Sequence, residues 1–198
     1  RRAETGEGEV TAYLLLTRYS PQRVETAGPG ALVIVGLHSA GKTTLSHRLS
    51  QLLGGRRIVE LGDLVRDEAQ RNGSNSLLKT AESMMLLAPD EIARRALESL
   101  SISEIGPIVV GPRTHAELAI LRSELHASVV AVDTPDAVRR GRWRRRHLHI
   151  SDTWEERERW EANWQTADLI RSADLMVSGH DWVGYAAARV IDQSESAH

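Results

Sequence analysis

The chain of 198 residues carries 25 basic and 27 acidic residues, which gives a formal net charge of −2. This length is enough for one domain with a hydrophobic core. The charge gives no electrostatic case for general nucleic-acid binding, so nucleic acid is not an expected partner. The chain has no cysteine, which excludes disulfides, thiolate zinc sites and a cysteine nucleophile. No run approaches the ~20 apolar residues that cross a membrane. We expect a cytoplasmic protein.

The N-terminal segment differs in composition from the remainder of the chain. Residues 1–9 are polar, residues 10–19 are apolar and tolerate a β-strand, and a Gly-Pro-Gly turn at 28–30 separates them from the rest. The sequence begins at Arg1 rather than at Met, so we expect that its start is missing. Residues 1–28 are then an N-terminal extension or the remnant of a neighbouring domain.

From residue 29 onward, strands and helices are predicted to alternate. Short apolar runs of strand length occupy 31–35, 57–61, 107–110, 128–133 and 173–177. Helices are predicted between them, over 42–53, ending near 72, over 75–87, from 89, over 115–125, from 135, over 152–171 and from 181. This alternation predicts an α/β fold of three layers, in which a mostly parallel five-stranded sheet lies between helices. We expect one domain over 29–192 and a polar tail over 193–198.

Residues 36–44, GLHSAGKTT, come after the first strand and open the first helix. The spacing of Gly36, Gly41, Lys42 and Thr43 is typical of a phosphate-binding P-loop. The glycines and small neighbours let backbone N–H groups curl around a phosphate, and the helix start adds its dipole. Lys42 is expected to reach the β- and γ-phosphates, and Thr43 to ligate Mg²⁺. The predicted ATP-binding residues are Gly36, Ser39, Ala40, Gly41, Lys42, Thr43 and Thr44.

The class of P-loop protein is indicated by the residues that accompany the loop. Only Lys42 and Lys79 among the 25 basic residues are lysines, so a lysine at the phosphate position is informative in an arginine-rich chain. The asparagine-lysine-x-aspartate signature of GTPases is absent from the sequence, and the chain is short for an ATPase motor. Small size and arginine-rich later segments favour a small-molecule kinase.

Four further segments resemble one group of such kinases. GDLVRDEA (62–69), VGPR (110–113), TWEE (153–156) and SADLMVSG (172–179) succeed one another in the order found in adenylate kinase-like and dephospho-CoA-kinase-like P-loop enzymes. The resemblance covers residues 31–192. It implies a kinase domain over 29–192, with a helical acceptor-binding insert at 62–100 and a short arginine-rich lid.

The resemblance also implies roles for individual residues. Arg66 would bind the acceptor phosphate, Asp63 would lie near the acceptor or the magnesium water shell, and Arg113 would bridge the donor and acceptor phosphates. Arg142 and Arg146 would belong to the lid, where guanidinium groups stabilise charge on the transferring phosphoryl group. The predicted catalytic residues are Lys42, Asp63, Arg113, Arg142 and Arg146, and the predicted acceptor-binding residues are Asp63, Arg66 and Arg113.

The chain departs from the pattern of this group at two positions. Related kinases have an Asp at the end of the third strand, where it helps to order Mg²⁺, whereas this chain has Val110. Either Asp63 or Asp133 takes over, or Mg²⁺ is held only by Thr43 and the phosphates, or catalysis is impaired. The second departure is Glu161, where relatives often have Asp.

The expected function is ATP- and Mg²⁺-dependent phosphoryl transfer to a small nucleotide-like acceptor, with a nucleoside monophosphate as the first choice. An acceptor phosphate is already ionised and nucleophilic, so no strong general base is required. The first alternative is a hydroxyl acceptor, such as dephospho-CoA or a modified nucleoside, with Asp63 as the base. The second alternative is a nucleotide-binding regulatory module with little turnover, which Val110 and the N-terminal segment favour. A third is a polynucleotide 5′-kinase, against which the lack of a basic surplus argues.

Overall fold

The computed structural model of this protein describes residues 30–100, 106–146 and 152–196. The predicted N-terminal extension, including the apolar segment 10–19, lies outside the described residues. Within the described ranges, no helix is long and apolar enough to cross a membrane.

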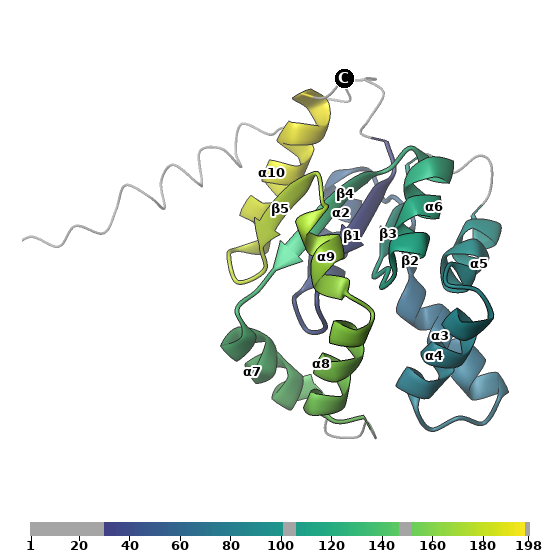
Figure 1. Cartoon of the computed structure of the whole chain (residues 1–198). Coiled ribbons are helices and arrows are strands. Elements are labelled where there is room, and N and C mark those ends of the chain that lie inside the picture. The colour runs from purple at the N-terminus through teal and green to yellow at the C-terminus, as the bar shows by residue number, and fades with distance from the viewer. Residues whose placement is uncertain (1–29, 101–105, 147–151, 197–198) are drawn as a thin grey trace, which may run out of the picture.

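Five strands form one sheet in which all neighbouring strands are parallel. In spatial order they are β2 (Ile58–Glu60), β3 (Ile108–Val110), β1 (Leu32–Val35), β4 (Ser128–Asp133) and β5 (Leu175–Ser178). The central strand β1 is buried along its whole length, which explains its continuous apolar sequence. The sheet runs through the middle of the molecule in Figure 1. The predicted α/β fold with a parallel five-stranded sheet is confirmed.

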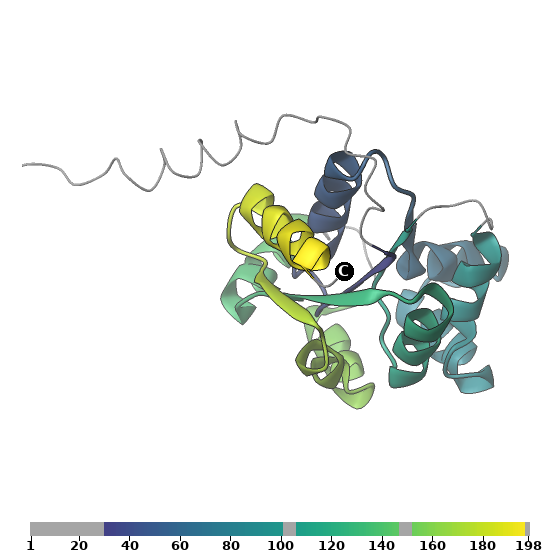
Figure 2. The same cartoon turned by 90° about the horizontal axis from the view of Figure 1, so that it is seen from above.

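Helices cover both faces of this sheet, as the view from above shows (Figure 2). Helices α2 (Lys42–Leu52) and α10 (Val183–Ser196) pack together on one face, and α6 (His115–Leu125) and α9 (Thr166–Arg171) contact the other. Because successive side chains of a strand point to opposite faces, the core divides into two clusters. Leu32 and Ile34 belong to the cluster under α2 and α10, whereas Val33 and Val35 belong to the other.

Two groups of helices extend this core. Helices α3 (Leu61–Arg71), α4 (Leu77–Leu87) and α5 (Glu91–Ser99) lie between β2 and β3 in the chain and pack against one another, as expected for the helical insert. The second group comprises α7 (Asp136–Arg146), which carries the predicted lid residues Arg142 and Arg146, and α8 (Trp154–Asn163). In Figure 1 this pair lies below the sheet, at the end where the P-loop connects β1 to α2.

Three boundaries differ from the sequence prediction. The second strand ends at Glu60, and Leu61 already begins α3, so the GDLVR segment lies in the first turns of a helix. The single helix expected over 152–171 is two helices, because Gln165 adopts a left-handed conformation (φ 54°) that ends α8 and precedes α9. Helix α10 continues to Ser196, into the segment expected to be a polar tail.

Candidate functional site

The P-loop is held in its curved shape by backbone conformations that glycine permits. Gly36 and Gly41 have φ angles of 151° and 109°, and Ser39 is also left-handed at 58°. A Cβ atom on Gly36 would lie 2.7 Å from the carbonyl oxygen of Val132, so a side chain does not fit there. The loop thus takes the conformation that its sequence motif predicts, between the central strand and α2.

Lys42 is folded back into the curve of this loop. Its Nζ donates hydrogen bonds to the carbonyl oxygens of Gly36 and Leu37, at 2.7 and 2.8 Å. Burial and the nearby Arg113 guanidinium lower the pKa of Lys42 to about 7. The two following predicted ligands, Thr43 and Thr44, are exposed at the start of α2. Phosphate oxygens in the loop would compete with the two carbonyls for the Lys42 ammonium.

A cavity of about 270 Å³ opens beside the P-loop. The P-loop forms one wall of it and the helical insert forms another, while the ends of β2 and β3 and helices α6, α7 and α8 complete the lining. The lining residues are His38, Ser39, Lys42, Thr43, Glu60, Leu61, Gly62, Val65, Arg66, Leu77, Leu78, Ala81, Ile92, Val110, Gly111, Arg113, Glu117, Trp143, Arg157 and Trp160. Charged groups at the P-loop side and apolar groups from the insert suit a small anionic molecule with an apolar body.

Arg113 enters this cavity from the loop after β3. Its side chain forms an ion pair with Glu161, and Nη1 lies 3.4 Å from the carbonyl oxygen of Gly36. Its backbone is fixed by Glu117, a buried carboxyl whose Oε2 accepts a hydrogen bond from the Arg113 N–H at 2.6 Å. Glu117 also forms a capping box with Thr114 at the start of α6, and burial raises its pKa to about 7. The spacing of Thr114 and Glu117 could have identified this carboxyl in the sequence.

The two predicted acceptor residues on α3 occupy different positions. Arg66 lines the cavity, but Asp63 is not among the residues that line it. Asp63 and Arg66 form an ion pair with each other, and both side chains are more than half exposed, at 60% and 53%. The structure therefore places Arg66 and Arg113 on the lining of one cavity and leaves Asp63 outside that lining.

Of the two predicted lid arginines, Arg142 does not join Arg113. Arg142 donates from Nη1 to the carbonyl oxygen of Ala40, at 2.7 Å, and from Nη2 to that of Gly179. It lines a second cavity, of about 160 Å³, on the other flank of the P-loop with Gly41, Thr44 and Asp181. Arg146 ends helix α7, and its side chain lies outside the described residues.

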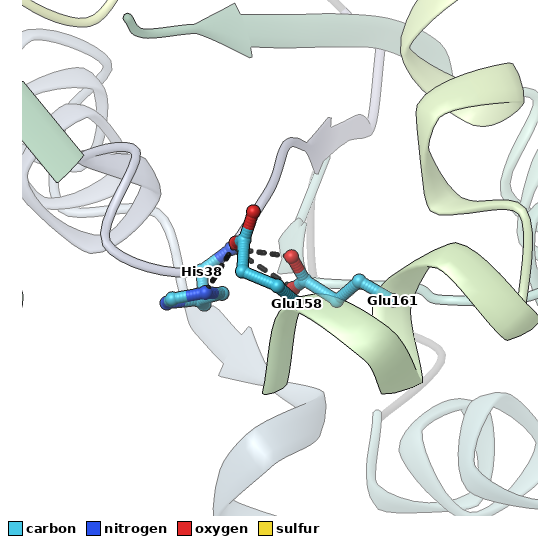
Figure 3. Close-up of side chains that lie close together, drawn as sticks. All are labelled: His38, Glu158 and Glu161. Carbon is cyan, nitrogen blue, oxygen red and sulfur yellow. Dashed lines mark hydrogen bonds and ion pairs between the residues drawn. The ribbon is translucent and has the colours of Figure 1, made fainter. Parts of the chain in front are cut away.

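A cluster around His38 links the P-loop to α7 and α8, and sequence reasoning missed it. Glu158 and Glu161, one turn apart on α8, both point at His38 (Figure 3). His38 Nε2 lies 2.6 Å from Glu158, and both oxygens of Glu161 accept from the His38 N–H, at 2.9 and 3.0 Å. The imidazole packs edge-on against Trp143 and Trp154. Burial lowers the pKa of His38 to about 4, so the ring is neutral at physiological pH.

The same three residues could in principle ligate a metal ion, because their ligand atoms lie within 4.8 Å of one another. However, both carboxylates already have cationic partners. Glu158 accepts two hydrogen bonds from Arg139, at 2.8 and 3.0 Å, and Glu161 pairs with Arg113. The arginines neutralise the charge that would attract a metal. We therefore interpret the cluster as a tether between the P-loop and helix α8.

Comparison with known proteins identifies the family of this chain. A family model described as "AAA domain" matches residues 32–163, and the chain belongs to this family. Its relatives include UPF0200 proteins. The one from Methanothrix thermoacetophila is 31% identical over 156 residues, which cover 72% of this chain and 84% of the relative. The chain is a member of this UPF0200 group. A second member, from Thermococcus gammatolerans, is 26% identical over 161 residues, or 74% of this chain and 84% of that protein.

Solved structures of small-molecule kinases share the fold. Shikimate kinase from Acinetobacter baumannii, in complex with shikimate, aligns with a TM-score of 0.61 at 18% identity and covers 85% of this chain and 94% of that chain. A gluconokinase from Sinorhizobium meliloti aligns with a TM-score of 0.52 at 14% identity, over 85% and 93% of the two chains. The predicted resemblance to P-loop kinases and the three-layer architecture are confirmed at the level of the fold.

Proposed function

We propose that this protein transfers a phosphoryl group from ATP to a small nucleotide-like acceptor, with a nucleoside monophosphate as the first choice. The observation that carries the proposal is that Lys42 of the P-loop, Arg113 and Arg66 line one cavity. These residues come from three separate elements, and each offers a cation to a phosphate. The apolar side chains of the insert in the same cavity suit the remainder of a nucleotide-sized acceptor.

The phosphoryl donor, ATP, would occupy the P-loop and the second cavity beside it. The curved backbone around Ser39, Ala40 and Gly41 presents N–H groups to the phosphates at the start of α2. The cavity that Arg142 and Asp181 line, on the flank away from Arg113, would take the nucleoside end of ATP. In this arrangement Arg142 binds the donor rather than the transferring group, so its role differs from that of a lid residue over the reaction centre.

The oxygen ligand available at the P-loop fits Mg²⁺. The exposed Thr43 hydroxyl lies at the start of α2 and lines the cavity, and oxygen ligands are those that Mg²⁺ prefers. The ion, when bound with ATP, would neutralise charge on the phosphates. Arg113 would leave Glu161, or share it, in order to contact the acceptor phosphate. Because the acceptor phosphate is already ionised, binding and orientation by Arg66 and Arg113 are the chain's main contribution.

A hydroxyl acceptor is the second candidate. The carboxyl groups of Glu60 and Glu117 line the cavity, and a hydroxyl nucleophile needs a base of that kind. The kinases named shikimate kinase and gluconokinase, which share the fold, carry names that indicate hydroxyl-bearing acceptors. The cations in the cavity favour an anionic acceptor in either case.

The experiment is a transfer screen with radiolabelled ATP and Mg²⁺ across nucleoside monophosphates and hydroxyl acceptors. We expect label on a monophosphate, and Arg113→Ala should lower kcat/KM by about 10³, the scale of a guanidinium that stabilises phosphoryl transfer. Arg122→Ala, a partly exposed arginine on α6 outside the cavity, is the matched control and should keep activity. Label on hydroxyl compounds alone would refute the monophosphate preference. Tight ATP binding without label on any acceptor would identify a regulatory module.

A further inference from the structure

Glu60 lies beside the position where related kinases have an acidic strand end. Strands β2 and β3 are parallel neighbours, and their register pairs Glu60 with Val110 directly. The residues two positions earlier, Ile58 and Ile108, are paired in the same way. Glu60 therefore lies on the strand next to that of Val110, at the same register position.

The side chains of Glu60 and Val110 also point to the same face of the sheet. Paired residues of neighbouring strands share a face, and residues two apart along one strand do as well. Val110 and Ile58 both pack in the core cluster under α2 and α10. Glu60 continues that face at the carboxyl end of β2, which is the face on which α2 begins with Lys42 and Thr43.

The carboxylate of Glu60 is available for a ligand. It lines the cavity together with Lys42, Thr43 and Val110. Within the described part of the chain, its side chain makes no hydrogen bond or ion pair, and it does not cap α3 although Glu60 is the residue before that helix. Its charge acts on the P-loop all the same, because Glu60 is one of the anions that favour the protonated form of Lys42.

The two carboxylates that the sequence offers as replacements are placed less well. Asp63 is exposed and paired with Arg66, and Asp133 is exposed at the end of β4. Neither is among the residues that line the cavity with Thr43. Of these three carboxylates, Glu60 is the one that is paired with Val110, lies on the same face of the sheet and lines the cavity.

We propose that Glu60 holds Mg²⁺ at the nucleotide site, directly or through the water shell of the ion, together with Thr43 and in place of the acidic residue that Val110 replaces. The inference rests on the proposed function in one respect, namely that a nucleotide occupies the P-loop with Mg²⁺. A flexible glutamate that reaches from the neighbouring strand then supplies the charge that the third strand lacks.

The test measures metal binding rather than turnover. Mn²⁺, as the probe for Mg²⁺, is titrated into the full chain with a non-hydrolysable ATP analogue and followed by electron paramagnetic resonance. Glu60→Gln should weaken Mn²⁺ binding about tenfold or more, the scale found when groups that support a metal are removed. The matched controls Asp63→Asn and Asp133→Asn should change it less than twofold. An unchanged Mn²⁺ affinity in Glu60→Gln overturns the proposal.

A rescue variant tests the replacement itself. In Glu60→Gln combined with Val110→Asp, the carboxylate returns to the third strand at the same register and on the same face. We expect Mn²⁺ affinity to recover by at least half of the lost factor, with circular dichroism reporting an intact fold. A folded double variant that remains as weak as Glu60→Gln overturns the claim that Glu60 takes the place of that residue.

The outcomes separate this inference from the proposed function. If no acceptor is labelled but Glu60→Gln still weakens Mn²⁺ binding, the phosphoryl-transfer proposal fails and the metal role of Glu60 holds. If an acceptor is labelled and Glu60→Gln binds Mn²⁺ as the wild type does, the metal role fails and the transfer proposal holds.

Discussion

At the scale of single residues, Lys42 is a group whose protonation a nucleotide bound in the P-loop should change. Its pKa is lowered to about 7 by burial and by Arg113, so near pH 8 most of the free protein carries a neutral amine. Phosphate anions favour the charged form and raise this pKa. ATP binding near pH 8 should therefore take up as much as about one proton, whereas near pH 6 the uptake should be much smaller because most Lys42 is already charged. Calorimetry in two buffers of different ionisation enthalpy measures the uptake.

Lys42→Arg is the control for this prediction. A guanidinium remains protonated throughout this pH range, so the variant should bind with the same heat in both buffers if it retains affinity. Equal heats for the wild type near pH 8 would contradict the prediction, because they would mean that Lys42 is charged before the nucleotide binds.

The residues of the site were predictable from the sequence to different degrees. The P-loop is a local motif, so its conformation and the position of Lys42 followed from consecutive residues. Glu60 gave no signal, because its relation to Val110 depends on the pairing of β2 with β3, and α3, α4 and α5 lie between these strands in the chain. In the sequence Glu161 stands out only as a departure from the pattern of the related kinases, since its contact with His38 joins positions 123 residues apart.

At the scale of elements, helix α8 is tied to the P-loop through one buried carboxylate. Glu161 is 3% exposed, accepts from the His38 N–H and pairs with Arg113. In Glu161→Ala both groups lose their partner, and the free energy of unfolding should fall by about 3 kcal/mol, the lower end for breaking a buried pair because Arg113 is partly exposed. Urea denaturation measures this change.

The matched control on the same helix is Glu155→Ala. Glu155 is 66% exposed, and its ion pair with Arg140 is long, at 3.7 Å. Its removal should therefore change the free energy of unfolding by about 0.5 kcal/mol or less. If Glu161→Ala proves as stable as Glu155→Ala, the contacts of Glu161 with His38 and Arg113 contribute nothing to the stability of the fold.

The elements themselves were largely predictable, because alternating apolar runs and amphipathic segments are local properties. The break between α8 and α9 was not. Glutamine is not a helix-breaking residue, so Gln165 gave no local signal for the break, and the burial of Thr166 and Leu169 just after it is a tertiary property. Likewise, β2 ends at Glu60 rather than at residue 61 because α3 already begins at Leu61, where the insert leaves the sheet.

At the scale of the whole molecule, Gly179 is where three distant segments meet. A Cβ atom there would overlap Thr134 Oγ1 and the carbonyl oxygen of Ala40, and the Gly179 N–H donates to Asp133 after β4. Thr134 in turn donates to Ala40, at 2.7 Å. The end of β4, the end of β5 and the P-loop are therefore packed too closely for any side chain, and the second cavity is built on that contact.

Gly179→Ala should push Thr134 and Ala40 apart and distort the P-loop from the side of the second cavity. We expect a loss of about 1–3 kcal/mol in unfolding free energy, as for overpacking of a core, and at least about a tenfold loss of ATP affinity at a temperature where the variant is folded. Gly141→Ala is the control, because nothing lies within 4 Å of a Cβ atom there and alanine favours the interior of α7 by about 1 kcal/mol. Equilibrium binding of a fluorescent ATP analogue compares the two. If Gly179→Ala binds the analogue as tightly as Gly141→Ala does, the junction of β4, β5 and the P-loop does not shape the nucleotide site.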